Sequence, residues 1–187
     1  MKPISFAILK LLSDGQFHSG TQIAQFLGVS RTSVSNALRG IDEFGVTLYR
    51  VTGKGYRWIN PVQWLDKNAI NQYLAEYSQR FRITIDEVVE STNTILLNTS
   101  KAKNYDQSMI DVVVTELQTK GRGRRGRSWF SGLGDSLTFS LSWQFQQGVN
   151  FLAGLSLVVG IAIIRTFTSL GIREVALKWP NDLLFNS

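Results

Sequence analysis

Seven residues near the middle of the chain, 121–127, carry an unusual concentration of charged guanidinium groups. They read Gly-Arg-Gly-Arg-Arg-Gly-Arg, and Ser128, Trp129 and Phe130 follow at once. Guanidinium groups bind carboxylates and phosphates through paired hydrogen bonds, and glycine lets a backbone approach a ligand closely. The composition therefore predicts a mobile anion-binding loop, named here the arginine loop, and disfavours a helix or strand. A solvated basic linker and a nucleic-acid-binding tract are the alternatives.

Two further polar clusters stand beside predicted strands. Residues 90–94 read Glu-Ser-Thr-Asn-Thr between a predicted strand and a predicted helix, so their hydroxyls and amide can cap the helix or bind a polar ligand. Residues 178–182 read Lys-Trp-Pro-Asn-Asp at the end of a strand expected over 175–179, where a plain β-turn is the alternative.

Length and composition limit the classes of protein to consider. The chain has 187 residues, 43% of them hydrophobic, with no cysteine and one histidine, His18. This composition supports a packed core and excludes disulfide scaffolds, zinc ribbons and thiol nucleophiles. No cleavable signal is visible, and the longest apolar run, 151–164, is too short to span a bilayer and is expected to form a buried helix. We therefore expect a cytoplasmic protein that does not contact a membrane.

The positive charge is concentrated in the first third of the chain. Residues 1–60 carry seven basic and three acidic side chains, whereas 61–187 carry thirteen and eleven. Most of the excess in the second part lies in the arginine loop. This distribution indicates a small polyanion-binding module ahead of a nearly neutral domain with one local anion site.

The first third has the pattern of a helix-turn-helix. Apolar residues at helical spacing predict a helix over 4–12, and Ser19 and Ser30 can cap two more helices, with Gly28 ending the first of these. On the third helix four apolar residues are expected to face inward: Val34, Ala37, Leu38 and Ile41. Alternating residues at 46–51 and 56–59 around a glycine turn predict a two-stranded wing.

The outward face of the third helix and the wing tip suit DNA. The residues that we expect to contact DNA are Arg31, Thr32, Ser35, Asn36, Arg39 and Lys54. Asn36 can form a bidentate pair with adenine, while the cations bind phosphates. A three-helix scaffold that only packs on its neighbour is the alternative.

The remainder, 61–187, mixes helices and strands without simple alternation, which predicts an α+β sheet. Asn60 before proline is the expected domain boundary, followed by a helix over 62–78. Strands are expected near 81–89, at 110–114 and at 137–143, where Leu137, Phe139, Leu141 and Trp143 would form the half-buried face.

The three motifs, together with Gln118, occur in the order and spacing found in bacterial biotin protein ligases. The chain resembles that family, and its front part resembles the bifunctional members that also repress the biotin operon. The resemblance implies a winged helix-turn-helix over 1–60 followed, over 61–187, by a mixed-sheet catalytic domain of the biotin/lipoate ligase type.

The resemblance also implies a reaction and partners. Such ligases join biotin to ATP, giving biotinyl-5′-AMP, and pass the biotinyl group to a lysine of biotin carboxyl-carrier protein. Biotin and ATP would be the substrates, and Mg²⁺ the metal ion. The adenylate would act as corepressor by favouring a homodimer that binds operator DNA.

Site residues follow from the same resemblance. Biotin would be bound by Ser91, Thr92, Asn93, Gln118, Arg122, Gly123 and Arg124. ATP and the adenylate would be bound by Arg127, Trp129, Lys178, Asn181 and Asp182. Catalytic roles would fall to Arg124, Lys178 and Asp182, the last also as a Mg²⁺ ligand. Neutral donors and acceptors suit a urea ring, and guanidinium groups suit a carboxylate beside a phosphate.

The family has a further lysine, more strands and a small β-barrel after the third motif, whereas the sequence ends at Ser187. We therefore expect a fragment, or a shortened product with impaired ligation. The alternative function is a ligand-sensing repressor that has lost ligation. A lipoate-type ligase is a third class, which the winged helix and the arginine loop disfavour.

Overall fold

The computed structural model describes residues 1–60, 62–102, 104–146, 148 and 152–185, without the side chain of Arg124. The chain divides into two compact units, Met1–Trp143 and Gln144–Ser187, and each is described by itself. Helices and strands are mixed in both, which confirms the α+β class. Among the described residues no helix is long and apolar enough to cross a membrane.

Three short helices begin the first unit: α1 (Pro3–Leu12), α2 (Gly20–Leu27) and α3 (Arg31–Ala37). The Ser19 side chain accepts a hydrogen bond from the Gln22 N–H in the first turn of α2 and forms a capping box, and Gly28 ends this helix with a left-handed φ of 65°. Both caps were expected from the sequence, and they place α2 and α3 as a helix-turn-helix.

The third helix is shorter than expected. It ends at Ala37, and Gly40, with φ of 73°, leads into a separate 3-10 turn, η1 (Ile41–Phe44). Leu38 and Ile41 are buried, as expected, but neither lies within α3. The prediction that Arg39 belongs to the outward face of this helix was wrong, because the chain has already left the helix at that residue.

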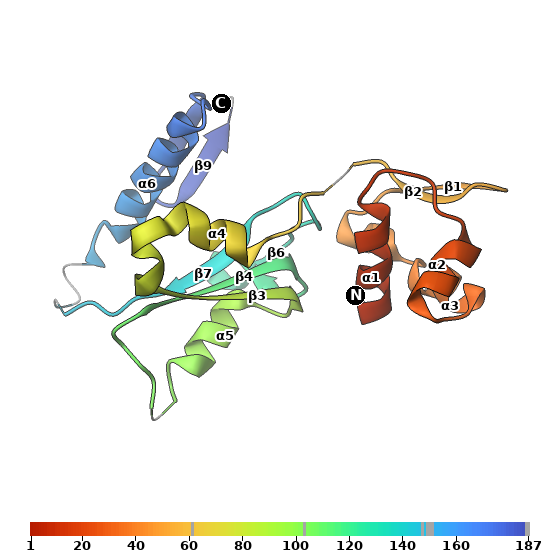
Figure 1. Ribbon diagram of the computed structural model, residues 1–187. Helices are drawn as coiled ribbons and strands as arrows, with labels where there is room; N and C mark the ends of the chain where they lie inside the picture. Colours follow the sequence, from red (N-terminus) through yellow and green to blue (C-terminus); the bar gives the residue numbers. More distant parts are fainter. Residues whose placement is uncertain (61, 103, 147, 149–151, 186–187) are drawn as a thin grey trace. The chain divides into compact units, whose positions relative to one another are not determined.

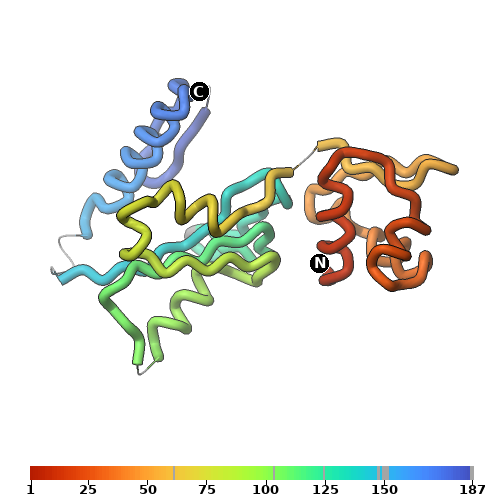
Figure 2. The backbone as a smooth tube through the Cα atoms, in the orientation of Figure 1, coloured from red at the N-terminus to blue at the C-terminus, as the bar shows by residue number. Residues whose placement is uncertain are grey.

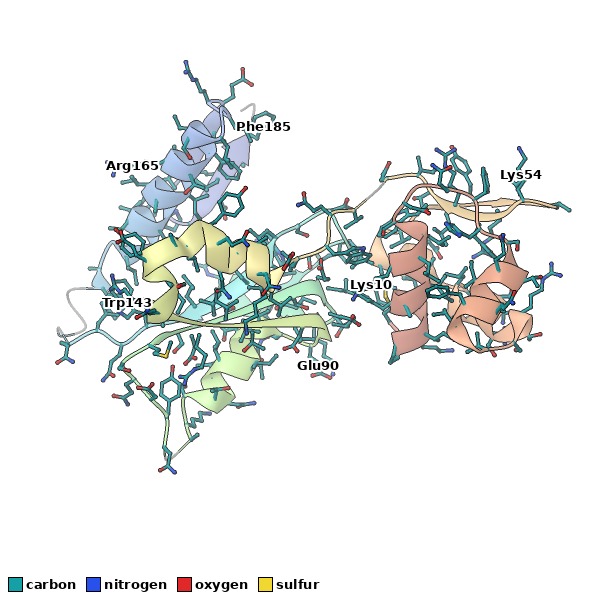
Figure 3. The ribbon with its side chains drawn as sticks, viewed as in Figure 1. Lys10, Lys54, Glu90, Trp143, Arg165 and Phe185 are labelled. Carbon is teal, nitrogen blue, oxygen red and sulfur yellow. The ribbon has the colours of Figure 1, made fainter. Side chains whose placement is uncertain are left out.

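The wing consists of β1 (Leu48–Val51) and β2 (Gly55–Trp58), paired antiparallel from Leu48↔Trp58 to Val51↔Gly55. Lys54 lies in the connecting turn and projects from the wing tip (Figure 3). The winged helix-turn-helix expected from the sequence is therefore confirmed.

A three-stranded mixed sheet forms the second half of this unit. β3 (Phe81–Val89) pairs parallel with β4 (Ile110–Gln118), which pairs antiparallel with the edge strand β7 (Thr138–Ser142). The helix expected over 62–78 is shorter and consists of α4 (Lys67–Leu74), capped by Asp66, and the 3-10 helix η2 (Ala75–Arg80).

Helices cover the two faces of the sheet (Figure 1). Leu65, Ile70 and Leu74 of the α4 region pack against Ile83, Val112 and Val114. The opposite face carries α5 (Thr92–Thr99), which contacts β4 and β7. The alternation of β4 explains this division, because successive side chains point to opposite faces.

The expected burial on β7 is wrong. Its apolar face is exposed, with exposed fractions of 66% for Leu137, 45% for Phe139, 55% for Leu141 and 58% for Trp143. β7 is an edge strand, and the apolar cluster beneath α4 does not include these side chains.

The second unit contains α6 (Leu155–Ser169) and a hairpin of β8 (Val175–Lys178) and β9 (Asp182–Phe185), which runs beside the helix (Figure 2). The expected buried helix is present but not buried, since Gly160 is its only buried residue among those described. Among the described residues of this unit, β8 of the hairpin contacts the helix. The expected first residue, 151, lies outside the described residues.

The winged helix and the sheet share a core within the first unit. Leu117 of β4 and Leu133 are buried in the same cluster as Phe6 and Ile8. The Leu133 N–H donates to the Phe44 carbonyl at 2.9 Å. Lys10 and Glu87 form an ion pair at 2.5 Å. The winged helix and the sheet therefore contact each other at several points along the chain, and not only at the connection near residue 60.

A second set of contacts fixes the segment before α4. The Trp64 ring lies 5.0 Å from that of Phe6, and its Nε1–H donates to Ser13 Oγ at 3.1 Å. The Leu65 N–H donates to Glu116 Oε1 at 2.7 Å, and burial raises the pKa of this carboxyl. The segment is thus bonded to both the winged helix and the sheet.

A buried carboxylate lies near the start of β4. Asp111 is 4% exposed and accepts two hydrogen bonds from Arg82, at 2.5 and 3.1 Å, and a short one from Tyr105 Oη–H. The Arg82 guanidinium beside Asp111 holds the pKa of that carboxyl below its usual range. Since the folded-state pKa is depressed, the ionised group stabilises the fold above about pH 4, and this stabilisation is lost as the pH falls further.

We predict that Asp111→Asn lowers the free energy of unfolding at pH 7 by about 1–3 kcal/mol, because buried donors lose their charged acceptor. Urea unfolding at pH 7 and pH 3 measures the effect, with Asp42→Asn, an exposed residue, as the control. The difference between wild type and Asp111→Asn should shrink at pH 3. An equal loss at both pH values contradicts the assignment.

Candidate functional site

A cavity of about 600 Å³ lies where the end of β4 and β7 meet the start of α5 and the arginine loop. The residues that line it include hydroxyl side chains, two amides, one guanidinium and three apolar residues. The full lining is Ser91, Thr92, Asn93, Gln118, Arg122, Gly123, Gly126, Trp129, Ser136, Leu137, Thr138, Phe139 and Ser140.

A hydrogen-bond network joins three elements at the wall of the cavity. The Gln118 side-chain carbonyl accepts from the Thr92 N–H at 2.9 Å and from the Thr92 hydroxyl at 3.2 Å. Thr92 Oγ1 also lies 2.8 Å from Ser140 Oγ. Thr92 is 2% exposed, so these bonds satisfy polar groups that would otherwise be buried without partners. They fix the end of β4, the start of α5 and β7 to one another.

The capping alternative for residues 90–94 is also observed. Ser91 is the N-cap of α5, and its hydroxyl accepts from the Thr94 N–H at 3.4 Å. Capping does not remove Ser91 from the cavity, whose lining it shares with Asn93. The same short segment thus begins the helix and supplies polar groups to the site.

The arginine loop is a small hairpin, contrary to the expectation that strand and helix are disfavoured. β5 (Gly121–Arg122) pairs with β6 (Ser128–Trp129), and a 3-10 turn, η3 (Arg124–Gly126), connects them. The Gly123 N–H donates to the Arg127 carbonyl at 2.7 Å, and Arg125 has φ of 57°. The composition missed this, because three glycines permit a tight hairpin as readily as an irregular loop.

The base of this hairpin is bonded to the segment before α5. The Thr119 and Lys120 N–H groups donate to the Val89 and Glu90 carbonyls at 2.9 and 2.8 Å. These bonds continue the β3–β4 pairing by two residues and deliver the arginine loop to the edge of the cavity.

Gly121 has no room for a side chain. A Cβ at this position would collide with the Trp129 carbonyl oxygen and lie 2.7 Å from Gln118 Nε2. At Gly123, by contrast, the nearest atoms would be 3.5 Å away, an ordinary contact. Close backbone approach across β5 and β6 therefore requires glycine at the first position and not at the second.

Six residues expected to bind biotin line this one cavity: Ser91, Thr92, Asn93, Gln118, Arg122 and Gly123. The seventh, Arg124, has its side chain outside the described atoms. Trp129, expected near adenine, lines the same cavity and is 58% exposed. Arg127 is exposed and is not among the lining residues.

The third motif lies in the second unit. Lys178 and Asp182 are cross-strand partners that close the β8–β9 hairpin, so the turn expected as an alternative is present. The Asn181 Nδ2–H donates to Asp182 Oδ1 at 2.8 Å. The structure describes these residues within their own unit only.

The sequence analysis did not predict that β7 and the residues just before it line the cavity. Ser136, Leu137, Thr138, Phe139 and Ser140 all line the cavity. The alternation of the strand was recognised, but its polar face was not connected with the site. The serine and threonine alternation from 136 to 142 was the available signal.

No group of three or more histidine, aspartate or glutamate side chains close enough to hold a metal ion occurs among the described residues. Asp182 can offer carboxylate oxygen beside the Asn181 amide. Mg²⁺ is commonly held by one or two carboxylates together with substrate phosphates. The Asp182 donor set therefore fits an ion that arrives with a nucleotide and not a closed protein site.

Three of the six expected DNA contacts line one of two hollows. Arg31 lines a cleft of about 430 Å³ between α2, α3 and the wing, together with Thr21, Arg50 and Thr52. Asn36 and Arg39 line a separate hollow of about 360 Å³ that includes Lys2. Thr32 and Ser35 are exposed on α3 and line neither.

Two family models match the chain. The biotin/lipoate A/B protein ligase family matches residues 85–187, and a helix-turn-helix domain family matches residues 5–57. The first match covers the sheet from Ile85 onward, the cavity and the third motif. The second covers the three helices and the wing.

Similar proteins carry matching names. The chain is 38% identical over 180 residues to the bifunctional ligase/repressor BirA of Salmonella typhimurium, covering 96% of the chain and 54% of that protein. Identity to the Escherichia coli protein of the same name is 37% with the same coverage. The chain thus spans about half the length of the curated relatives it matches.

Solved structures of biotin protein ligases are also similar. The Leishmania major enzyme in complex with biotin has a TM-score of 0.47 and 26% identity, over 56% of this chain and 46% of that one. The Aquifex aeolicus enzyme in complex with biotin and ATP has a TM-score of 0.44 and 32% identity, over 56% and 41%.

We predict that Gly121→Ala lowers the free energy of unfolding by about 1–3 kcal/mol, the cost of forcing extra volume into a packed site. Gly123→Ala is the matched control and should stay within about 0.5 kcal/mol, since its Cβ meets ordinary contacts. Chemical denaturation measures both. Equal stabilities of the two variants contradict the described packing.

Proposed function

Because the chain belongs to the biotin/lipoate A/B protein ligase family, we propose that it acts as a biotin protein ligase and biotin-operon repressor. The similar proteins named bifunctional ligase/repressor support both halves of this proposal. Their names also favour it over a repressor that has lost ligation. The proposed domains are a DNA-binding domain over 1–60 and a catalytic domain over 61–187.

The observation that carries the proposal is the convergence of two sequence motifs on one cavity. Residues from 91–93 and from 118–123 come from different elements, yet they line the same 600 Å³ volume. Hydroxyl and amide side chains together with apolar residues in the lining suit a ligand with a urea group and a hydrocarbon chain.

The proposed reaction is acyl activation followed by transfer. A biotin carboxylate oxygen attacks the α-phosphorus of ATP, and pyrophosphate leaves. A lysine amine of biotin carboxyl-carrier protein then attacks the acyl carbon, losing a proton, and AMP leaves. Arg122 at the cavity edge would bind the carboxylate, and Arg124 would stabilise charge that develops on the phosphate.

Nucleotide binding is assigned to both units. Trp129 offers a flat apolar face for adenine, and Arg127 a charge for phosphate. In the second unit Lys178 would neutralise phosphate charge, while Asn181 and Asp182 offer polar contacts. Mg²⁺ bound with the nucleotide would neutralise phosphate charge, with Asp182 as its protein ligand.

The regulatory half of the proposal concerns DNA. The adenylate would favour a homodimer, which presents two winged helices to a two-fold operator in the cytoplasm. Arg31 and Lys54 would contact phosphates, and Asn36 a base, with further contacts from Thr32, Ser35 and Arg39.

We predict that Arg122→Ala weakens biotin binding at least about 10-fold, because a charge-assisted hydrogen bond to the carboxylate is lost. Calorimetric titration measures the affinity. Arg125→Ala is the control, since Arg125 is exposed and does not line the cavity, and it should bind as wild type does. Failure of folded wild-type chain to bind biotin would refute the proposal.

We predict that Arg31→Ala and Lys54→Ala each reduce the slope of log affinity against log salt concentration for duplex DNA by about 1. Fluorescence anisotropy over a salt series measures the slope. Lys67→Ala on α4 is the control, because this exposed lysine lies outside the winged helix. Slopes equal to that of wild type would exclude these two side chains as phosphate contacts.

A further inference from the structure

Two side-chain contacts connect the arginine loop and the residue before it with the segment that begins α5. Lys120 Nζ lies 2.6 Å from Glu90 Oε1, and both side chains are 70% exposed. Figure 3 shows Glu90 at the end of the sheet. The second contact is a hydrogen bond from the Arg122 Nη2–H to Thr94 Oγ1 at 2.5 Å. The exposed ion pair contributes little to stability, so the second contact is the more informative one.

Thr94 reaches the site only through Arg122. It is the third residue of α5, and its N–H is bonded to the capping hydroxyl of Ser91 at 3.4 Å. Thr94 does not line the cavity, whereas Arg122 does. The Thr94 hydroxyl is therefore held by the capped first turn of α5 and contacts the Arg122 guanidinium from outside the cavity.

We propose that Thr94 is a positioning residue that holds the Arg122 guanidinium at the cavity edge, ready for the carboxylate of the ligand. This role rests on the proposed binding of biotin in the cavity. The family resemblance gives roles to Ser91, Thr92 and Asn93 in this segment and none to Thr94.

The chemistry of the hydroxyl suits this role. A neutral acceptor orients a guanidinium without neutralising it, whereas a carboxylate, such as Glu90 beside Lys120, pairs with the charge. Arginine has five N–H donors, so one bond to Thr94 leaves others for an anion. A long side chain that is already oriented loses less conformational freedom when the ligand binds.

The opposite role for Thr94 would have the opposite effect on biotin affinity. If Thr94 held Arg122 away from the ligand, removing its hydroxyl would strengthen binding. The geometry favours positioning, because Arg122 lines the cavity while it is bonded to Thr94.

The test is calorimetric titration of biotin into this chain with four substitutions. Thr94→Val keeps the shape and removes the acceptor, and it should weaken binding about 3- to 10-fold. Thr94→Ser retains the hydroxyl and should bind like wild type. Thr99→Val, on the same helix, is the matched control, since the Thr99 hydroxyl donates to the Ile95 carbonyl within α5. In an Arg122→Ala background, Thr94→Val should have no further effect.

A ligand-free measurement separates positioning from general destabilisation. ¹⁵N relaxation of the Arg122 Nε–H group should show increased motion in Thr94→Val and not in Thr94→Ser, with unchanged unfolding midpoints. Equal motion in wild type and Thr94→Val, equal biotin affinities, or tighter binding by Thr94→Val would overturn the positioning role alone. Absence of biotin binding by folded wild type would overturn the proposed function together with this role.

Discussion

The site depends on one side-chain carbonyl, that of Gln118. It accepts both the backbone N–H and the hydroxyl of Thr92, at 2.9 and 3.2 Å, and Thr92 in turn lies 2.8 Å from Ser140 Oγ. Separating β4 from the start of α5 would leave a buried amide and hydroxyl without partners, which costs more free energy than the bonds themselves contribute. The cavity wall is therefore fixed before a ligand arrives.

This arrangement divides the polar groups into two kinds. Thr92 and the Gln118 carbonyl bond mainly to each other and frame the cavity, while Asn93 and the Arg122 guanidinium line it with donors that remain for a ligand. The Gln118 amide nitrogen lies close to Gly121, so the frame also approaches the base of the β5–β6 hairpin. Rigidity of the wall and placement of the hairpin thus share a physical origin.

Much of this could be predicted from residue types alone. Ser19, Ser30 and Gly28 marked the helix-turn-helix, because caps and left-handed C-terminal residues are local interactions. The end of α3 could not be placed, since Leu38 and Ile41 have the spacing of a helix face, yet Leu38 is buried at the C-cap and Ile41 in the separate 3-10 turn.

Burial was the weaker part of the prediction. Alternation along β7 identifies which side chains share a face, but not what covers that face, so Phe139 and Leu141 were wrongly expected to be buried. The same difficulty hid the site residues of β7. Cross-strand and cross-motif distances, such as that from Thr92 to Ser140, depend on tertiary structure that a pattern of single residues does not contain.

Leu133 gives the domain arrangement a consequence for recombination. It follows the arginine hairpin in sequence, is 2% exposed, and lies in the core of the winged helix with its N–H bonded to the Phe44 carbonyl. Exchange of the first sixty residues for those of another winged helix-turn-helix protein would therefore replace one side of this core and leave the other side unchanged. A functional chimera would need compatible residues at 117 and 133, far from the point of exchange in the sequence. The boundary near residue 60 therefore does not separate two structurally independent parts.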